Sequence, residues 1–162
     1  MFYEKYVQQE LDMSPRIENV YEVVRVEQVL MERPAGYTST IVSSTSAGNM
    51  GVKEIGNDAS EVVLVAMLNT KNEINALHRV FTGSLNTSVA HPREIFRSAI
   101  LNNAARIIIY HNHPSGDLEP SEADMRFTRR LLEAGELMGI EVIDHIIVNS
   151  KEYLSMREEN YI

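Results

Sequence analysis

The sequence predicts a single α/β domain in which helices flank one mixed β-sheet. Segments of strand length alternate along the chain with segments of helical periodicity, a pattern typical of α/β domains. Two of the strand-like segments, residues 61–68 and 73–81, are separated only by turn-forming residues, so this pair predicts an antiparallel hairpin within the sheet. With 162 residues, the chain is long enough to bury a core and short enough to form one domain.

The composition narrows the classes of function. The net charge of −8 is spread over both halves of the chain, which argues against tight non-specific binding to nucleic acid. There is no cysteine, so a bound metal would need histidine, aspartate or glutamate ligands. No apolar run approaches the roughly 20 residues that span a bilayer, and the N-terminus lacks the pattern of a signal peptide. A cytoplasmic protein without a membrane partner is therefore expected.

Residues 1–42 are interpreted as an N-terminal extension with one strand, and residues 43–162 as the domain proper. The strand prediction rests on the valine-rich residues 20–31, whose apolar spacing would also allow a helix. The serines and threonine of residues 43–46 are N-cap candidates for a helix that reaches about Ile55. Gly48 and Gly51 weaken this prediction, because glycine costs about 1 kcal/mol relative to alanine inside a helix.

The middle of the chain predicts two strands, then a helix, then a further strand. Residues 61–68 have the length and β-branched content of a buried strand, and residues 73–81 return beside it. After a connecting loop at residues 83–90, a helix is expected at residues 92–103, with Pro92 in its first position and His91 as a cap or surface residue. Residues 104–110 then form a strand that we expect in mid-sheet, covered on both faces.

A third helix and a further strand are expected in the last quarter of the chain. Residues 121–138 carry an apolar stripe and end before Gly139, a plausible C-cap. Residues 140–148 read as a strand containing His145, which we interpret as a structural histidine or as a support for a ligand, with a carboxylate as its candidate partner. Residues 151–156 are a candidate edge strand, and a homodimer through an exposed edge is one option for assembly.

The residues that suggest chemistry lie between positions 107 and 124. An apolar run stops at His111-Asn112-His113-Pro114, and residues two apart on an extended chain share a face, so both imidazoles can point to one place. Asp124 follows in the first turn of the next helix. Two imidazoles and one carboxylate with an open fourth position are typical of a catalytic zinc site.

Simpler interpretations of these residues remain open. A His-x-His pair in a strand is more often not a metal site. Ser121 and Asp124 also fit a helix-capping pair, in which a metal ion would compete for the aspartate. Both interpretations can hold for Ser121, and the joint pattern of all four residues favours the metal site.

The spacing of these residues resembles a known family. His111-x-His113, seven residues, Ser121, two residues and Asp124 match the motif of the JAMM metalloproteases without a gap. Four flanking segments resemble the RadC branch of that superfamily: Thr82-Gly83-Ser84-Leu85-Asn86, His91-Pro92-Arg93-Glu94-Ile95-Phe96, His111-Asn112-His113-Pro114-Ser115-Gly116 and Asp144-His145-Ile146-Ile147. The resemblance implies a cytidine-deaminase-like JAMM/MPN fold and a zinc ion held by His111, His113 and Asp124.

The resemblance also implies a reaction, the zinc-dependent hydrolysis of peptide or isopeptide bonds in a protein or peptide substrate. It places a glutamate at the start of a strand ahead of the histidines, in contact with the attacking water, and Glu61 fits this place better than Asp58. Ser121 would donate a hydrogen bond to the developing oxyanion.

Two alternatives to this enzyme remain. The domain would serve as a non-catalytic, zinc-binding interaction module if it bound the metal without turnover. It would act on phosphodiesters if the DNA-repair label of the RadC family applied, but the acidic charge and the lack of a helix-hairpin-helix-like segment disfavour that reading.

Overall fold

The computed structural model describes residues 20–83 and 91–162. The chain divides into two units, Met1–Met31 and Glu32–Ile162, and all helices and strands described below belong to the second. Predictions for the first residues of the chain and for most of the loop at residues 83–90 lie outside the described residues. No helix in the described ranges is long and apolar enough to cross a membrane.

The strand predicted at residues 20–31 is wrong. These residues have no regular secondary structure, and their valines are exposed, with 93% of Val20 and 98% of Val29 accessible. A strand is stabilised by pairing and by burial of one face, and the exposed valines of this segment bury no face. β-Branched content alone therefore did not identify a strand here.

The second unit contains a five-stranded mixed sheet in the order β2-β1-β3-β4-β5. β1 pairs antiparallel with both β2 and β3, β3 pairs parallel with β4, and β4 pairs antiparallel with β5. The predicted hairpin, the central position of β3 and the C-terminal edge strand are thus confirmed. The strands are β1 (Val62–Leu68), β2 (Ile74–Thr82), β3 (Arg106–Asn112), β4 (Glu141–Val148) and β5 (Tyr153–Ser155).

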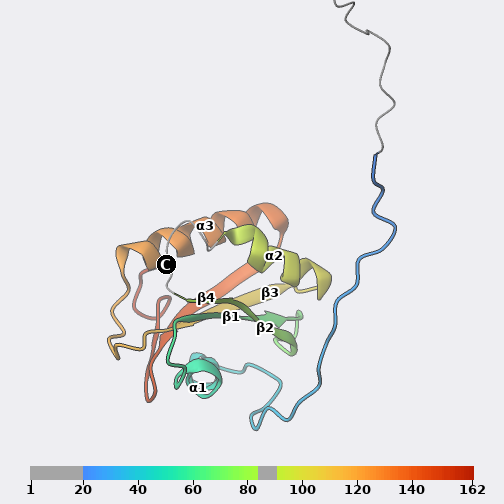
Figure 1. Cartoon of the computed structure of the whole chain (residues 1–162). Coiled ribbons are helices and arrows are strands. Elements are labelled where there is room, and N and C mark those ends of the chain that lie inside the picture. The colour runs from blue at the N-terminus through green and yellow to red at the C-terminus, as the bar shows by residue number, and fades with distance from the viewer. Residues whose placement is uncertain (1–19, 84–90) are drawn as a thin grey trace, which may run out of the picture. The chain divides into compact units, whose positions relative to one another are not determined.

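Helix α1 (Ser44–Ile55) covers one face of the sheet (Figure 1). Ser43, one of the four predicted N-cap candidates, caps it through a capping box with Ser46. The glycines that weakened the prediction lie at the contact with the sheet. A Cβ atom on Gly51 would lie 2.4 Å from the ring of Tyr110, and one on Gly48 would lie 2.4 Å from that of Tyr153. Both glycines lower the helix propensity of α1, but they let the helix lie close to two aromatic rings.

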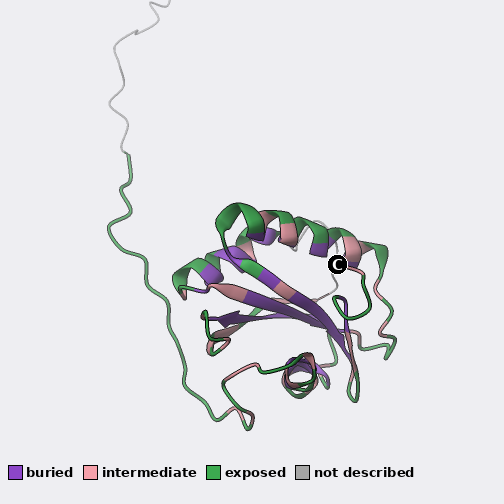
Figure 2. Cartoon of the chain, turned by 180° about the vertical axis from the view of Figure 1, so that it is seen from behind, coloured by how far each residue is buried: buried purple, intermediate pink, exposed green. Residues whose placement is uncertain are grey.

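Helices α2 (Pro92–Leu101) and α3 (Glu122–Met138) cover the opposite face. His91 is the N-cap of α2, since its Nδ1 accepts a hydrogen bond from the backbone of Arg93 at 3.1 Å. Gly139 ends α3 in the left-handed conformation, with φ 68°. β1 and nearly all of β3 are buried between the two layers of helices (Figure 2).

Successive residues of β3 point to opposite layers. Ile107 and Ile109 belong to the apolar cluster under α2 and α3, whereas Ile108 and Tyr110 belong to the cluster under α1. His111 continues the first row. The fold therefore directs this histidine towards α3, the helix that carries Asp124.

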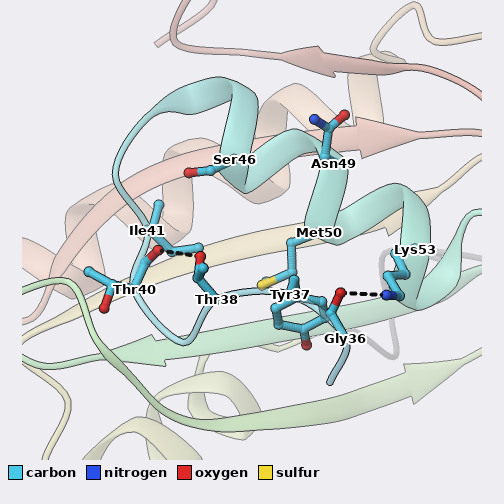
Figure 3. Close-up of a pocket in the computed structure, with 9 residues that line it drawn as sticks. All are labelled: Gly36, Tyr37, Thr38, Thr40, Ile41, Ser46, Asn49, Met50 and Lys53. Carbon is cyan, nitrogen blue, oxygen red and sulfur yellow. Dashed lines mark hydrogen bonds between the residues drawn. The ribbon is translucent and has the colours of Figure 1, made fainter. Parts of the chain in front are cut away.

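A separate hollow of about 280 Å³ lies beside α1, on the other face of the sheet from that histidine (Figure 3). It is formed by residues 36–41 and by one side of α1, including Met50 and Lys53. Two residues that line the hollow are joined by a hydrogen bond, which Lys53 donates to the backbone oxygen of Gly36 at 2.8 Å.

Candidate metal centre

The two histidines of the motif meet at the end of the central strand. His111 is fully buried, and His113 lies one residue beyond β3. The backbone of His113 still donates to the carbonyl of Val148, the last residue of β4, so the chain remains extended past the end of β3. The Nε2 atoms of His111 and His113 lie 2.7 Å apart. The prediction that both imidazoles point to one place agrees with this geometry.

Asp124 joins the histidines from the first turn of α3. Its Oδ1 lies 3.3 Å from Nε2 of His111, and its Oδ2 lies 3.6 Å from Nε2 of His113. One ligand atom from each of the three residues lies within 4.8 Å of the others. The group therefore combines two imidazoles and a carboxylate, a donor set that suits zinc.

The helix cap at Ser121 uses only one of the two carboxylate oxygens of Asp124. Its Oδ2 accepts from the backbone of Ser121 at 2.8 Å and from the Ser121 hydroxyl at 2.6 Å. The backbone of Asp124 donates in return to Oγ of Ser121 at 3.2 Å. Because these bonds use only Oδ2, the capping box leaves Oδ1 directed towards His111.

Electrostatics keeps this carboxylate ionised. Burial would raise the pKa of Asp124, but the nearby ring of His113, the field of His111 and hydrogen bonds from Ser121 outweigh it and hold the pKa well below its ordinary value. Burial lowers the pKa of His111, whereas the neighbouring carboxylate of Asp124 raises that of His113. The group thus presents an anionic oxygen beside a neutral, buried imidazole, as a divalent cation requires.

The ring of His113 has a defined orientation. Its Nδ1 lies 2.6 Å from the backbone oxygen of Asp117, and a carbonyl oxygen can only accept, so Nδ1 carries the proton. In the neutral ring, Nε2 then has a free lone pair directed at Nε2 of His111. Two imidazole nitrogens at 2.7 Å need a proton or a cation between them.

Glu61 lies next to this group. It directly precedes β1, and the antiparallel register of β1 and β3 ends at the pair Val63–His111, so Glu61 and His113 both lie just beyond the same end of the two strands. Its charge contributes to the raised pKa of His113. Asp58, the other carboxylate considered for this place, is ion-paired with Arg79.

Asn112 holds the Glu61 segment in place, a role that sequence reasoning missed. The side chain of Asn112 is fully buried and accepts from the backbone of Val62 at 2.7 Å. It donates to the carbonyls of Asp58 and Ser60, at 3.0 Å each. The available signal was a polar residue between two histidines, at the end of an apolar strand, whose side chain must point to the face opposite theirs.

His145 lies behind His111 and outside the group of three. Its Nε2 is 2.7 Å from Nδ1 of His111, and its Nδ1 is 2.5 Å from Oγ1 of Thr128. Asp144, the neighbouring carboxylate, accepts from the backbone nitrogen of His145, so Thr128 orients the ring where a carboxylate was the candidate. Burial lowers the pKa of His145 to about 4, so the ring is neutral at pH 7.

The fold and this group define a mixed α/β domain with a histidine–aspartate cluster at the end of its central strand. Comparison with known proteins identifies the family. Residues 41–161 match the family model described as "RadC-like JAB domain", and the chain belongs to this family. The resemblance inferred from the motif and its flanking segments is thereby confirmed.

Curated relatives in several bacteria are similar to most of the chain. A UPF0758 protein of Latilactobacillus sakei is 43% identical over 122 residues, which cover 75% of this chain and 54% of the relative. One from Enterococcus faecalis is 46% identical over 121 residues, covering 75% and 52%. One from Bacillus velezensis is 39% identical over 166 residues, covering 95% and 69%. The chain spans about half the length of the first two relatives, and none of these names states an activity.

Proposed function

We propose that the domain is a zinc-dependent hydrolase of amide bonds, with His111, His113 and Asp124 as the metal ligands. The observation that carries the proposal is the pair of Nε2 atoms 2.7 Å apart beside an ionised carboxylate. Membership of the JAB domain family adds support, since domains of this superfamily are often hydrolytic. When bound there, zinc would supply the Lewis acidity that activates water and polarises a carbonyl group.

Glu61 is the general base and acid in this proposal. The carboxylate takes a proton from the attacking water and returns it to the nitrogen of the leaving amine as the amide bond breaks. Its place near His113, on whose pKa its charge acts, is suited to this task. Asn112 keeps it there, through the three hydrogen bonds that fasten residues 58–62 to the end of β3.

Ser121 stabilises the oxyanion that develops on the substrate carbonyl. Its hydroxyl proton is directed at Oδ2 of Asp124, so the hydroxyl must rotate to donate to the substrate. The rotation gives up only this bond, because the two backbone bonds between Ser121 and Asp124 do not use that proton. The capping box would therefore hold the serine in place while its proton is redirected.

The substrate is expected to approach from the side of His113. The side chain of His113 is 14% exposed, whereas that of His111 is fully buried and that of Asp124 is 3% exposed. Glu61 is half-buried near the same opening. A protein or peptide substrate is proposed here, because such substrates supply the amide bond that the proposed reaction breaks.

Zinc content by elemental analysis is the first test. Reconstituted wild type should hold about one zinc ion per chain, as expected of a single four-coordinate site, and the His111→Ala/His113→Ala double variant should hold none. His91→Ala is the matched control, because His91 caps α2 and belongs to no ligand group.

The outcomes separate the alternatives. Reconstituted wild type without zinc would mean that Ser121 and Asp124 only cap α3, and the hydrolase proposal would be rejected. Wild type that holds zinc but leaves peptide and isopeptide libraries uncut would instead support a non-catalytic zinc-binding module.

A further inference from the structure

A chain of buried hydrogen bonds runs from His111 to the backbone of Asp124. Nδ1 of His111 lies 2.7 Å from Nε2 of His145, whose Nδ1 lies 2.5 Å from the hydroxyl of Thr128. The hydroxyl in turn donates to the carbonyl of Asp124 at 2.7 Å. His111, Thr128 and His145 are all fully buried. The chain thus begins and ends on proposed ligands and reaches them through the interior.

The protons of this chain have one consistent direction. A carbonyl oxygen has no proton, so Thr128 must donate to Asp124. A hydroxyl has a single proton, and therefore Thr128 accepts from His145, whose proton lies on Nδ1. In this tautomer of His145, with its proton on Nδ1, Nε2 is the acceptor of the next bond, and the proton of His111 lies on Nδ1.

The direction of these hydrogen bonds decides which nitrogen of His111 carries the proton, and therefore whether His111 can bind a metal ion. With its proton on Nδ1, the Nε2 lone pair is free and points at His113 and Asp124. If Thr128 donated to His145 instead, every bond would reverse and a proton would occupy Nε2 of His111, where the metal must bind. The bond from Thr128 to the carbonyl of Asp124 is the contact that opposes this reversal.

We propose that Thr128 and His145 are positioning residues, which hold His111 in the Nδ1-protonated tautomer so that its Nε2 is ready for the metal ion. This inference rests on the proposed function, because it takes His111 as a ligand. Partners of this kind orient the ligand ring, and their loss typically weakens metal binding about 10–100-fold. Thr128 would therefore act on a bound metal ion only indirectly, through the rings of His145 and His111.

Two substitutions at Thr128 give a matched test by zinc titration against a competing chelator. Thr128→Val keeps the branched shape and removes the hydroxyl, so the zinc dissociation constant should rise about 10–100-fold. Thr128→Ser keeps the hydroxyl and should retain the wild-type dissociation constant. Thr128→Val with wild-type zinc affinity would overturn the proposal.

A second measurement needs no variant and no metal. Nitrogen-15 NMR of histidine-labelled, metal-free wild type should show the proton of His111 on Nδ1, and a proton on Nε2 would overturn the proposal even if Thr128→Val does not fold. Wild type that binds no zinc but has the Nδ1 tautomer would reject the proposed function and leave the tautomer assignment standing. The two failures are therefore distinguishable.

Discussion

The two sides of β3 differ in what their residues do. On the side of α2 and α3, the row Ile107, Ile109 and His111 ends in a polar group that includes Asp124. On the side of α1, Ile108 and Tyr110 pack into an apolar cluster under a glycine-bearing helix. Both rows are buried, so burial alone does not separate packing from chemistry.

The difference shows how one strand can serve both purposes. Alternation gives each row its own neighbours, and only one row faces the helix that carries a carboxylate in its first turn. The apolar row anchors the strand in the core. A ligand on the other row is then held by a rigid element, which favours precise metal geometry.

The largest expected effect lies on the polar side. Glu61→Gln removes the proton carrier and keeps the shape, so turnover of an amide substrate should fall about 10²–10⁴-fold. Zinc content and the melting temperature should match wild type, because Glu61 is not a ligand in the proposed site. Asp58→Asn is the control and should retain turnover. Equal turnover in Glu61→Gln and wild type would remove Glu61 from the general-base role.

Asn112 follows Tyr110 in the row on the α1 side, and its substitution sharpens the comparison. Asn112→Asp is isosteric but loses both donors to the carbonyls of Asp58 and Ser60, so unfolding should require about 1–3 kcal/mol less free energy. Turnover should fall as well, because the segment that carries Glu61 is released, while zinc content stays unchanged. Chemical denaturation and a peptidase assay measure the two effects.

The same change in a distant turn provides the control for Asn112. Asn69→Asp keeps the acceptor oxygen that binds the backbone of Lys71 and Glu73, so turnover should be unaffected. Normal turnover in Asn112→Asp would show that Glu61 is positioned by other contacts.

The sequence predictions succeeded where the stabilising interactions are local, and they failed where a segment depends on a distant partner. Local signals identified the helix capped by Ser43, the hairpin and the helix end at Gly139, because caps, turns and periodicity act within a few residues. The valines of residues 20–31 led to a wrong strand prediction, because strand formation depends on a partner that the segment itself does not specify.

The candidate site shows the same limit. His111, His113 and Asp124 could be grouped from spacing and family resemblance, and the structure brings them together. The contact between Thr128 and His145 joins α3 to β4 and could not be predicted, since it depends on how the helix packs on the sheet. Adjacency in the sequence favoured a carboxylate as the partner of His145, but strand alternation turns neighbouring side chains to opposite faces.

A substitution on the α1 side tests packing without chemistry. Gly51→Ala places a Cβ atom 2.4 Å from the buried ring of Tyr110, so overpacking should outweigh the gain in helix propensity and lower the free energy of unfolding by about 1–2 kcal/mol. Gly48→Ala is the matched variant and should cost less, because Tyr153 is only half-buried in a short edge strand and can shift. Thermal denaturation measures both, and zinc content should not change. Loss of zinc in Gly51→Ala would show that the two sides of β3 are coupled.

The smallest expected effect is that of Tyr110→Phe, in the middle of the apolar row. The Tyr110 hydroxyl is buried, and no residue in ranges 20–83 and 91–162 forms a hydrogen bond with it. Burial also raises the pKa of this hydroxyl, so it remains neutral. Because removal breaks no hydrogen bond, the free energy of unfolding should be unchanged or rise by up to about 1 kcal/mol, as measured by chemical denaturation. A clear loss of stability would mean that the hydroxyl has a partner, and the α1 side of β3 would then be more than a packing surface.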